Sequence, residues 1–152
     1  MTIAARLEQK GFEPSEELVE LTRCAAGDGA VVSFVGLARH VGKAGERVDR
    51  LVLEHHPRLT EKSLQDIAFD AESRFEVSHV RVVHRCGEIQ PGEPIVFAGV
   101  AALHRRAAFE AADYLMDRLK TEAVFWKREE GPVGTMWIEP TGDDYADRGR
   151  WE

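Results

Sequence analysis

Residues 95–120 place a continuously apolar run directly before an amphipathic helix pattern. The run at 95–103 has the length and composition of a buried strand. From 105 to 120, small and aliphatic side chains recur at helical spacing, which predicts one helix with a closely packing, alanine-rich face. The recurring residues are Ala108, Ala111, Ala112, Leu115 and Leu119. The rest of the chain is interpreted around this strand and helix.

A strand pattern follows the helix after a short turn. Alternation over residues 124–130 gives the strand two distinct faces. One face carries Phe125, Lys127 and Glu129, and the other carries Val124, Trp126 and Arg128. Lys127 can therefore project back toward Lys120 at the end of the helix. Two neighbouring lysines disfavour each other's charge, which lowers the pKa of one and makes it a usable nucleophile or proton carrier. Standing alone, Lys120 would be an ordinary helix-terminal lysine.

Three cationic or titratable side chains crowd the other end of the helix: His104, Arg105 and Arg106. The helix dipole is positive there and disfavours each cation by roughly 0.3–1 kcal/mol. Free amides at a helix start bind phosphate or carboxylate, and a guanidinium adds bidentate recognition. The segment therefore predicts an anion site. The alternative is a set of solvated charges.

The two charged ends of this helix are too far apart to hold one small substrate. Arg105 and Lys120 are fifteen positions apart, which at about 1.5 Å per residue separates them by roughly 22 Å. If His104 and Arg105 act at the same site as Lys120 and Lys127, they come from a second copy of the chain. We therefore expect a homodimer with two shared pockets.

The remaining segments predict an α+β fold with a mixed or antiparallel sheet. Strand patterns occur at 2–8, 30–36, 51–55, 80–86 and 136–138, and helix patterns begin at Pro14 and near Thr60. The apolar run at 30–36 predicts a central strand buried on both faces, and its short connection to 51–55 favours an antiparallel pair. The glycine-rich and charged segment 39–47 predicts a mobile loop that could close over a substrate.

Length and composition indicate one compact domain over residues 1–140, followed by a loosely held polar tail at 141–152. The chain has 152 residues, of which 43% are hydrophobic. No stretch approaches the ~20 apolar residues of a membrane span, and the start lacks a signal-peptide pattern, so we expect a soluble, cytoplasmic protein.

The charges and cysteines narrow the class of ligand. A net charge of −7 argues against broad nucleic-acid binding. A local basic pocket in such a protein fits a small anionic substrate better. Cys24 and Cys86 are isolated and the six histidines are scattered, so we predict neither a disulfide framework nor a metal site, and no cofactor.

Five separated motifs together resemble the large, catalytic subunit of molybdopterin synthase, the MoaE family. The motifs are FVGLAR (34–39), LEHHP (53–57), HRCGE (84–88), HRRAAF (104–109), and LKT with FWKRE (119–121 and 125–129). They occur in family order over roughly residues 29–139. Any one of them would be weak, but their joint order is specific.

This resemblance implies a fold, an assembly and a reaction. The fold is of the α/β hammerhead type. The assembly is a homodimer within a heterotetramer, with a small ubiquitin-like sulfur-carrier subunit at each end. The C-terminal Gly-Gly thiocarboxylate of the carrier enters the pocket. Sulfur is transferred twice to cyclic pyranopterin monophosphate, which makes the dithiolene of molybdopterin during molybdenum cofactor biosynthesis.

The resemblance also implies roles for individual residues. Lys120 and Lys127 match the catalytic lysines of the family, with Lys120 as the principal group and Lys127 as its electrostatic support. The segments that match substrate-binding positions are Leu37-Ala38-Arg39, His104-Arg105 and Lys127-Arg128-Glu129. Whether Lys120 attacks covalently or only carries protons is left open. The family pattern differs at Leu103, Arg58 and Val124, and the differences at Leu103 and Arg58 affect the pocket wall and the partner surface.

Two other functions fit the residues alone. One is an enzyme that forms a Schiff base between a lysine and a carbonyl substrate. The other is a non-catalytic subunit that binds a pterin phosphate or a small protein. The family resemblance favours the synthase over both.

Overall fold

The computed structural model describes residues 2–152. The chain forms eight strands and four helices within the residues described, and helices are interspersed among the strands along the sequence. The elements are β1 (Thr2–Glu8), α1 (Pro14–Cys24), β2 (Ala30–Leu37), β3 (Arg50–His55), α2 (Leu59–Arg74), β4 (His79–Arg85), β5 (Gly87–Ile89), β6 (Pro94–Ala102), α3 (Arg105–Glu122), β7 (Phe125–Gly131), β8 (Gly134–Ile138) and α4 (Gly142–Gly149). The α+β class predicted from the sequence is confirmed.

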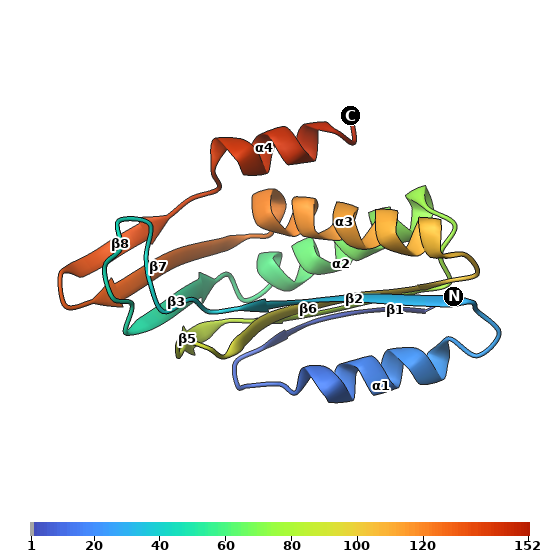
Figure 1. Ribbon diagram of the computed structural model, residues 1–152, viewed down its shortest axis with the longest axis horizontal. Helices are drawn as coiled ribbons and strands as arrows, with labels where there is room; N and C mark the ends of the chain where they lie inside the picture. The colour runs from blue at the N-terminus through green and yellow to red at the C-terminus, as the bar shows by residue number, and fades with distance from the viewer. Residues whose placement is uncertain (1) are drawn as a thin grey trace.

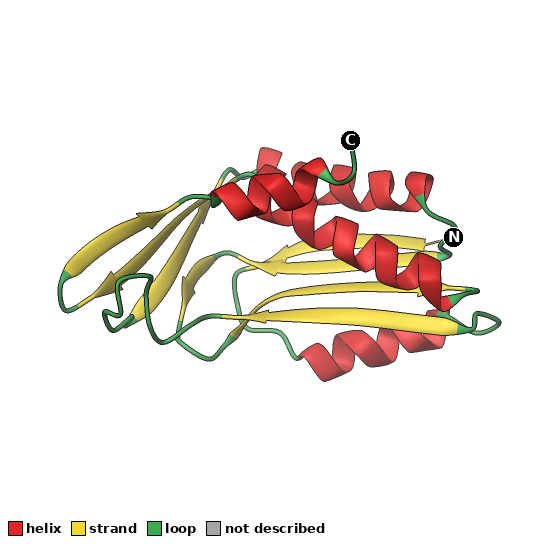
Figure 2. Ribbon diagram, turned by 45° about the horizontal axis from the view of Figure 1, so that its top comes forward, coloured by secondary structure: helices red, strands yellow, loops and turns green. Residues whose placement is uncertain are grey.

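The larger sheet has the strand order β1-β4-β6-β2. β1 and β4 are parallel, whereas β6 is antiparallel to both β4 and β2, so the sheet is mixed as predicted. Helices α2 and α3 cover one face of this sheet, and α1 covers the other (Figures 1 and 2). Coverage on both faces explains why β4 and β6 are almost continuously buried.

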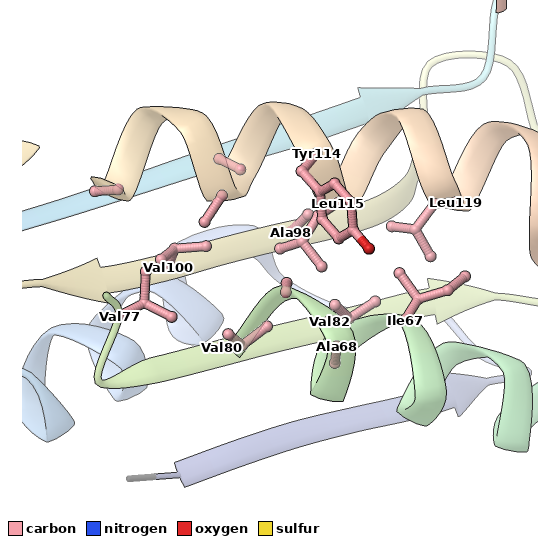
Figure 3. Close-up of a cluster of buried hydrophobic side chains, with 14 of the residues drawn as sticks. Ile67, Ala68, Val77, Val80, Val82, Ala98, Val100, Tyr114, Leu115 and Leu119 are labelled. Atoms are coloured by element: carbon pink, nitrogen blue, oxygen red, sulfur yellow. The ribbon is translucent and has the colours of Figure 1, made fainter. Parts of the chain in front are cut away.

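The main core lies between the larger sheet and the helices α2 and α3. Leu115 and Leu119 of α3 face Ile67 of α2 and the valines of β4 and β6 (Figure 3). Ala108 and Ala111 are fully buried, so the alanine-rich face brings α3 close to the sheet, as its spacing predicted. Within residues 2–152, no helix is long and apolar enough to cross a membrane.

The smaller sheet has the strand order β5-β3-β7-β8 and is antiparallel throughout. It extends from one end of the molecule, beyond the C-terminal end of α3 (Figure 1). Only Ala123 and Val124 connect α3 to β7. This short connection brings the last turn of α3 next to the smaller sheet.

Two expectations about β2 are wrong. It is an edge strand rather than a central one, and Phe34 and Leu37 are 43% and 60% exposed. A continuous run of apolar residues indicates that a strand has apolar surroundings. It does not determine whether the strand lies at the centre or at the edge of the sheet. β2 also does not pair with β3, because the connection at 38–49 carries the chain from one sheet to the other.

The expectation of a loosely held tail is also wrong. Residues 142–149 form α4, and Thr141 and Asp144 form a reciprocal capping box at its start. At its end, the Trp151 ring makes edge contacts with Phe75 and Tyr114 at 5.7 and 5.5 Å between centroids. The Trp151 Nε1 also donates to Asp117 Oδ2 at 2.7 Å. Local capping and an aromatic anchor therefore hold this polar segment against α3.

Candidate active site

A cavity of about 410 Å³ opens where α3, the smaller sheet and α4 meet. Its wall combines apolar side chains with a concentration of charged ones. The lining residues are Leu37, Arg39, Lys43, Leu51, Leu53, Ile95, Lys120, Thr121, Ala123, Phe125, Lys127, Glu129, Ile138, Glu139, Pro140, Thr141, Asp144 and Tyr145. A volume of this size accommodates a small-molecule substrate.

Lys120 and Lys127 reach this cavity from different elements. Lys120 lies in the last turn of α3, and Lys127 lies on β7 opposite Leu53 of β3. Phe125 and Glu129 line the same cavity, so the predicted face of the strand is confirmed. The structure therefore brings the two lysines together as the alternation of the strand predicted.

The surroundings of Lys127 disfavour the charged form of its side chain. Burial and, to a smaller extent, the nearby charge of Lys120 together lower the pKa of Lys127 from 10.5 to about 8, while Asp144 acts in the opposite direction. The sequence predicted that one lysine of the pair would have a lowered pKa. The structure places this effect on Lys127, and burial is a larger cause than its lysine neighbour.

A buried histidine lies behind the two lysines. His84 of β4 is 4% exposed, and its ring stacks on Phe125 at 4.3 Å. Its Nδ1 lies 2.8 Å from the carbonyl oxygen of Arg85, and because that oxygen only accepts, Nδ1 carries the hydrogen. Burial, with a contribution from Lys127 and Lys120, lowers the pKa of His84 to about 3. The imidazole is therefore a neutral part of the pocket's support.

Arg39 and Glu129 form a bidentate ion pair at the cavity wall. Arg39 Nε and Nη2 donate to the two Glu129 oxygens at 2.8 and 3.0 Å. Glu129 is 5% exposed, so this contact fixes both side chains. Ala38 is buried, and its N–H and C=O bond the backbones of Glu93 and Gly92. Ala38 therefore positions its neighbour Arg39 rather than lining the cavity.

Besides Ala38, three predicted site residues lie outside this cavity. Arg128 points to the other face of β7, where it pairs with Glu54 and Glu130. His104 and Arg105 are exposed at the opposite end of α3 from Lys120. A single chain therefore does not bring these three together with the lysines.

The sequence and the fold are matched among known proteins. The family model described as MoaE protein matches residues 7–122. The chain belongs to the MoaE protein family. A relative from Pseudomonas aeruginosa, named molybdopterin synthase catalytic subunit, is 45% identical over 99% of both chains. This membership confirms the resemblance inferred from the five motifs and places the chain in a family of enzyme subunits.

Solved structures share the fold of this MoaE family member. The MoaE protein from Burkholderia ambifaria has a TM-score of 0.81 and 37% identity, covering 99% of this chain and 97% of that chain. A complex of subunits 1 and 2 of molybdopterin-converting factor from Helicobacter pylori contains the same fold. Its TM-score is 0.72 at 18% identity, over 90% of this chain and 89% of that chain.

Some lining residues of this MoaE family member were not predicted. Lys43 reaches the cavity from the loop at 39–47, and Asp144 and Tyr145 reach it from α4. The threonine followed three positions later by an acidic residue was a readable signal for the start of α4. No local pattern marks Lys43. Among residues 2–152, no group of three or more potential metal-ligating side chains is present.

Proposed function

We propose that the cavity is the sulfur-transfer site of a molybdopterin synthase catalytic subunit. The observation that carries this proposal is the convergence of Lys120 and Lys127 in one cavity, with the pKa of Lys127 lowered to about 8. Lysines with lowered pKa values suit acyl and proton chemistry near neutral pH. The family membership supports the same reaction class.

The substrates of this reaction fit the charges of the cavity. The carrier's C-terminal thiocarboxylate and the phosphate of cyclic pyranopterin monophosphate are both anions. The lysines and Arg39 supply cationic groups, and Lys43 adds another from the loop. Apolar residues such as Phe125 and Ile138 provide a surface for the pterin ring.

Each sulfur transfer replaces a carbon–oxygen bond of the pterin substrate with a carbon–sulfur bond. The thiocarboxylate sulfur forms a bond to a carbon of the pterin side chain, and the bond from that carbon to its oxygen breaks, so that the oxygen leaves as water or with the phosphate group. The bond between the sulfur and the carrier's carbonyl carbon then breaks. Water supplies the oxygen that converts the carrier terminus to a carboxylate. Lys120 is the principal catalytic group, either as a transient acyl acceptor or as a proton carrier, and Lys127 supports it electrostatically.

The proposed partner is a small ubiquitin-like carrier with a Gly-Gly terminus. The relative from Pseudomonas aeruginosa is named as a catalytic subunit, and the structure from Helicobacter pylori is a complex of two subunits. These findings support a complex with a second kind of subunit, and we propose that the complex is a heterotetramer with one carrier for each copy of this chain. We also propose a cytoplasmic location, which the free thiols of Cys24 and Cys86 support.

A second copy of the chain completes the site in this proposal. His104 and Arg105 lie at the far end of α3 from Lys120, roughly 22 Å along its axis. Leu103 and Phe109 are exposed beside them. Exposed apolar side chains rimmed by polar residues are typical of a surface that is covered in an assembly. The homodimer would place this end of α3 at the partner's cavity.

Mixed dimers test the shared site. Lys120→Ala and Arg105→Ala chains are each expected to be nearly inactive alone. A random mixture should recover about one quarter of wild-type activity, because half of the dimers are mixed and each of these holds one intact site. A mixture no more active than its components would contradict a site built from two copies.

Reconstitution tests the reaction itself. Wild-type protein would be supplied with cyclic pyranopterin monophosphate and with a carrier that ends in either a thiocarboxylate or a carboxylate. Dithiolene product is expected only with the thiocarboxylate. A folded wild-type protein that binds the carrier and yields no product would refute the synthase assignment.

A further inference from the structure

Asp144 is a carboxylate at the cavity that the reaction above does not use. It lies in the first turn of α4 and lines the same cavity as Lys120 and Lys127. Its neighbour Asp143 is exposed and does not line the cavity. The helix therefore aims one of two adjacent acidic side chains at the lysines.

Two hydrogen bonds hold Asp144 in place, one at its side chain and one at its backbone. Asp144 Oδ2 accepts from the backbone N–H of Thr141 at 2.8 Å, and Thr141 Oγ1 accepts from the backbone N–H of Asp144 at 3.1 Å. Over residues 2–152, no ion pair within 4.0 Å joins Asp144 to Lys120 or Lys127. The capping box thus keeps the carboxylate near the ammonium groups without direct contact.

The other groups around Lys127 differ from Asp144 in charge, in pairing or in exposure. Lys120 approaches from α3 and Lys43 from the loop, and both are cations. The Glu129 carboxylate on β7 is already paired with Arg39. On the remaining sides lie the neutral His84, the exposed Glu139 and the phenol of Tyr145.

The electrostatic directions agree with this geometry. Asp144 raises the pKa of Lys127 against the larger effect of burial. Burial raises the pKa of Asp144, but hydrogen bonds from Thr141 and the charges of Lys120 and Lys127 outweigh it and leave the pKa lowered. The carboxylate therefore stays ionised opposite the two lysines.

We propose that Asp144 is a positioning residue that acts as a fixed counter-charge for the Lys120–Lys127 pair. Its capping bonds stop it from closing a tight ion pair with either lysine. Both ammonium groups remain free to meet an anionic substrate while their mutual repulsion is reduced. The consequence for catalysis rests on the proposed function, whereas the effect on Lys127 does not.

The test compares two substitutions that remove the same charge from adjacent positions. Asp144→Asn keeps an oxygen that can accept from Thr141, and Asp143→Asn is the matched control. Carbon-13 resonances of labelled lysine, with Lys127 assigned through Lys127→Met, would report the pKa of Lys127. A unit charge removed at several ångströms should lower that pKa by roughly 0.5 in Asp144→Asn. Asp143→Asn should leave it unchanged.

A third variant separates charge from folding. Asp144→Glu retains the charge and is a favoured capping-box residue, so it should restore the pKa of Lys127 toward the wild-type value. At pH 8 the charged fraction of Lys127 should fall about two-fold in Asp144→Asn. Equal titration curves for Asp144→Asn and Asp143→Asn would overturn the proposal.

The pH profile of sulfur transfer extends the test to the reaction. The limb governed by Lys127 should move to lower pH in Asp144→Asn, whether the lysine acts charged or neutral. An unmoved limb in an active Asp144→Asn protein would contradict the proposal. If the wild type transferred no sulfur, the proposed function would fail, and the titration of Lys127 would still decide the role of Asp144.

Discussion

Lys127 is held in an environment that disfavours its charge, and this predicts that methionine in its place stabilises the fold at neutral pH. The pKa of Lys127 falls from 10.5 to about 8. At about 1.4 kcal/mol for each pH unit, holding the charged lysine costs the folded state roughly 3 kcal/mol. Methionine is similar in length and carries no charge. Lys127→Met should therefore raise the free energy of unfolding at pH 7 by a large part of this cost.

The gain should depend on pH in a defined direction. Below pH 8 the lysine is charged in both states, and the folded protein bears the full cost. Between pH 8 and 10.5 the folded state releases the proton while the unfolded state keeps it, so wild-type stability rises with pH. Above pH 10.5 the lysine is neutral in both states. The advantage of Lys127→Met should therefore shrink steadily between pH 8 and 10.5.

Urea unfolding of the two proteins at pH 7, 9 and 10 measures this difference. Lys62→Met is the control, because Lys62 is an exposed lysine of α2 whose ion pair with Asp66 is worth little. Its effect should be within about 0.5 kcal/mol at every pH. A Lys127→Met protein that is no more stable than wild type at pH 7, or whose gain in stability does not fall with pH, would show that the charge of Lys127 does not destabilise the fold.

Three further predictions concern the walls of the cavity. A double-mutant cycle of Arg39→Met and Glu129→Gln should give a coupling free energy of about 2 kcal/mol in urea unfolding, since Glu129 is buried and accepts two hydrogen bonds from Arg39. A value near zero would show that the pair does not stabilise the fold. Trp151→Ala should cost about 2 kcal/mol of stability and reduce sulfur transfer by releasing α4; unchanged activity would show that α4 is dispensable. Lys43→Met should raise the KM for the pterin substrate several-fold with little change in kcat. A loop lysine that binds the ground state and the transition state equally well affects KM alone. An unchanged KM would show that Lys43 does not contact the substrate.

The sequence predicted α3 and β7, the two elements that carry the lysines, because local patterns determine both of them. Helical spacing of alanines and alternation in the next strand were enough to place Lys120 and Lys127 on converging elements. The short connection at Ala123 and Val124 left little freedom in how those elements meet. Contacts between sequence neighbours are the ones that periodicity can reveal.

The errors concern relations between distant segments. An apolar strand at a sheet edge and one at a sheet centre have the same composition, so the position of β2 was not readable. The packing of α4 depends on Trp151 meeting Phe75 and Tyr114, which lie far away in the sequence. For the same reason the entry of Asp144 into the cavity could not be foreseen from the chain alone.

The site role proposed for His104 and Arg105 requires a second copy of the chain, whereas the position of Arg128 is explained within one chain. His104 and Arg105 lie where the helix geometry predicted, at the far end of α3 from Lys120. Arg128 faces away from the cavity and is bound by Glu54 and Glu130, so its contribution inside one chain is to the smaller sheet. Strand alternation had already separated Arg128 from Lys127.

We propose that Lys120 carries the sulfur-transfer chemistry in this cavity. The most direct test is a single-turnover assay of dithiolene formation with thiocarboxylated carrier and cyclic pyranopterin monophosphate, comparing wild type, Lys120→Ala and the exposed-lysine control Lys62→Ala. We expect near-complete loss of product in Lys120→Ala with carrier binding intact, and wild-type rates in Lys62→Ala. Product formation at the wild-type rate by Lys120→Ala would show that Lys120 is not the catalytic group.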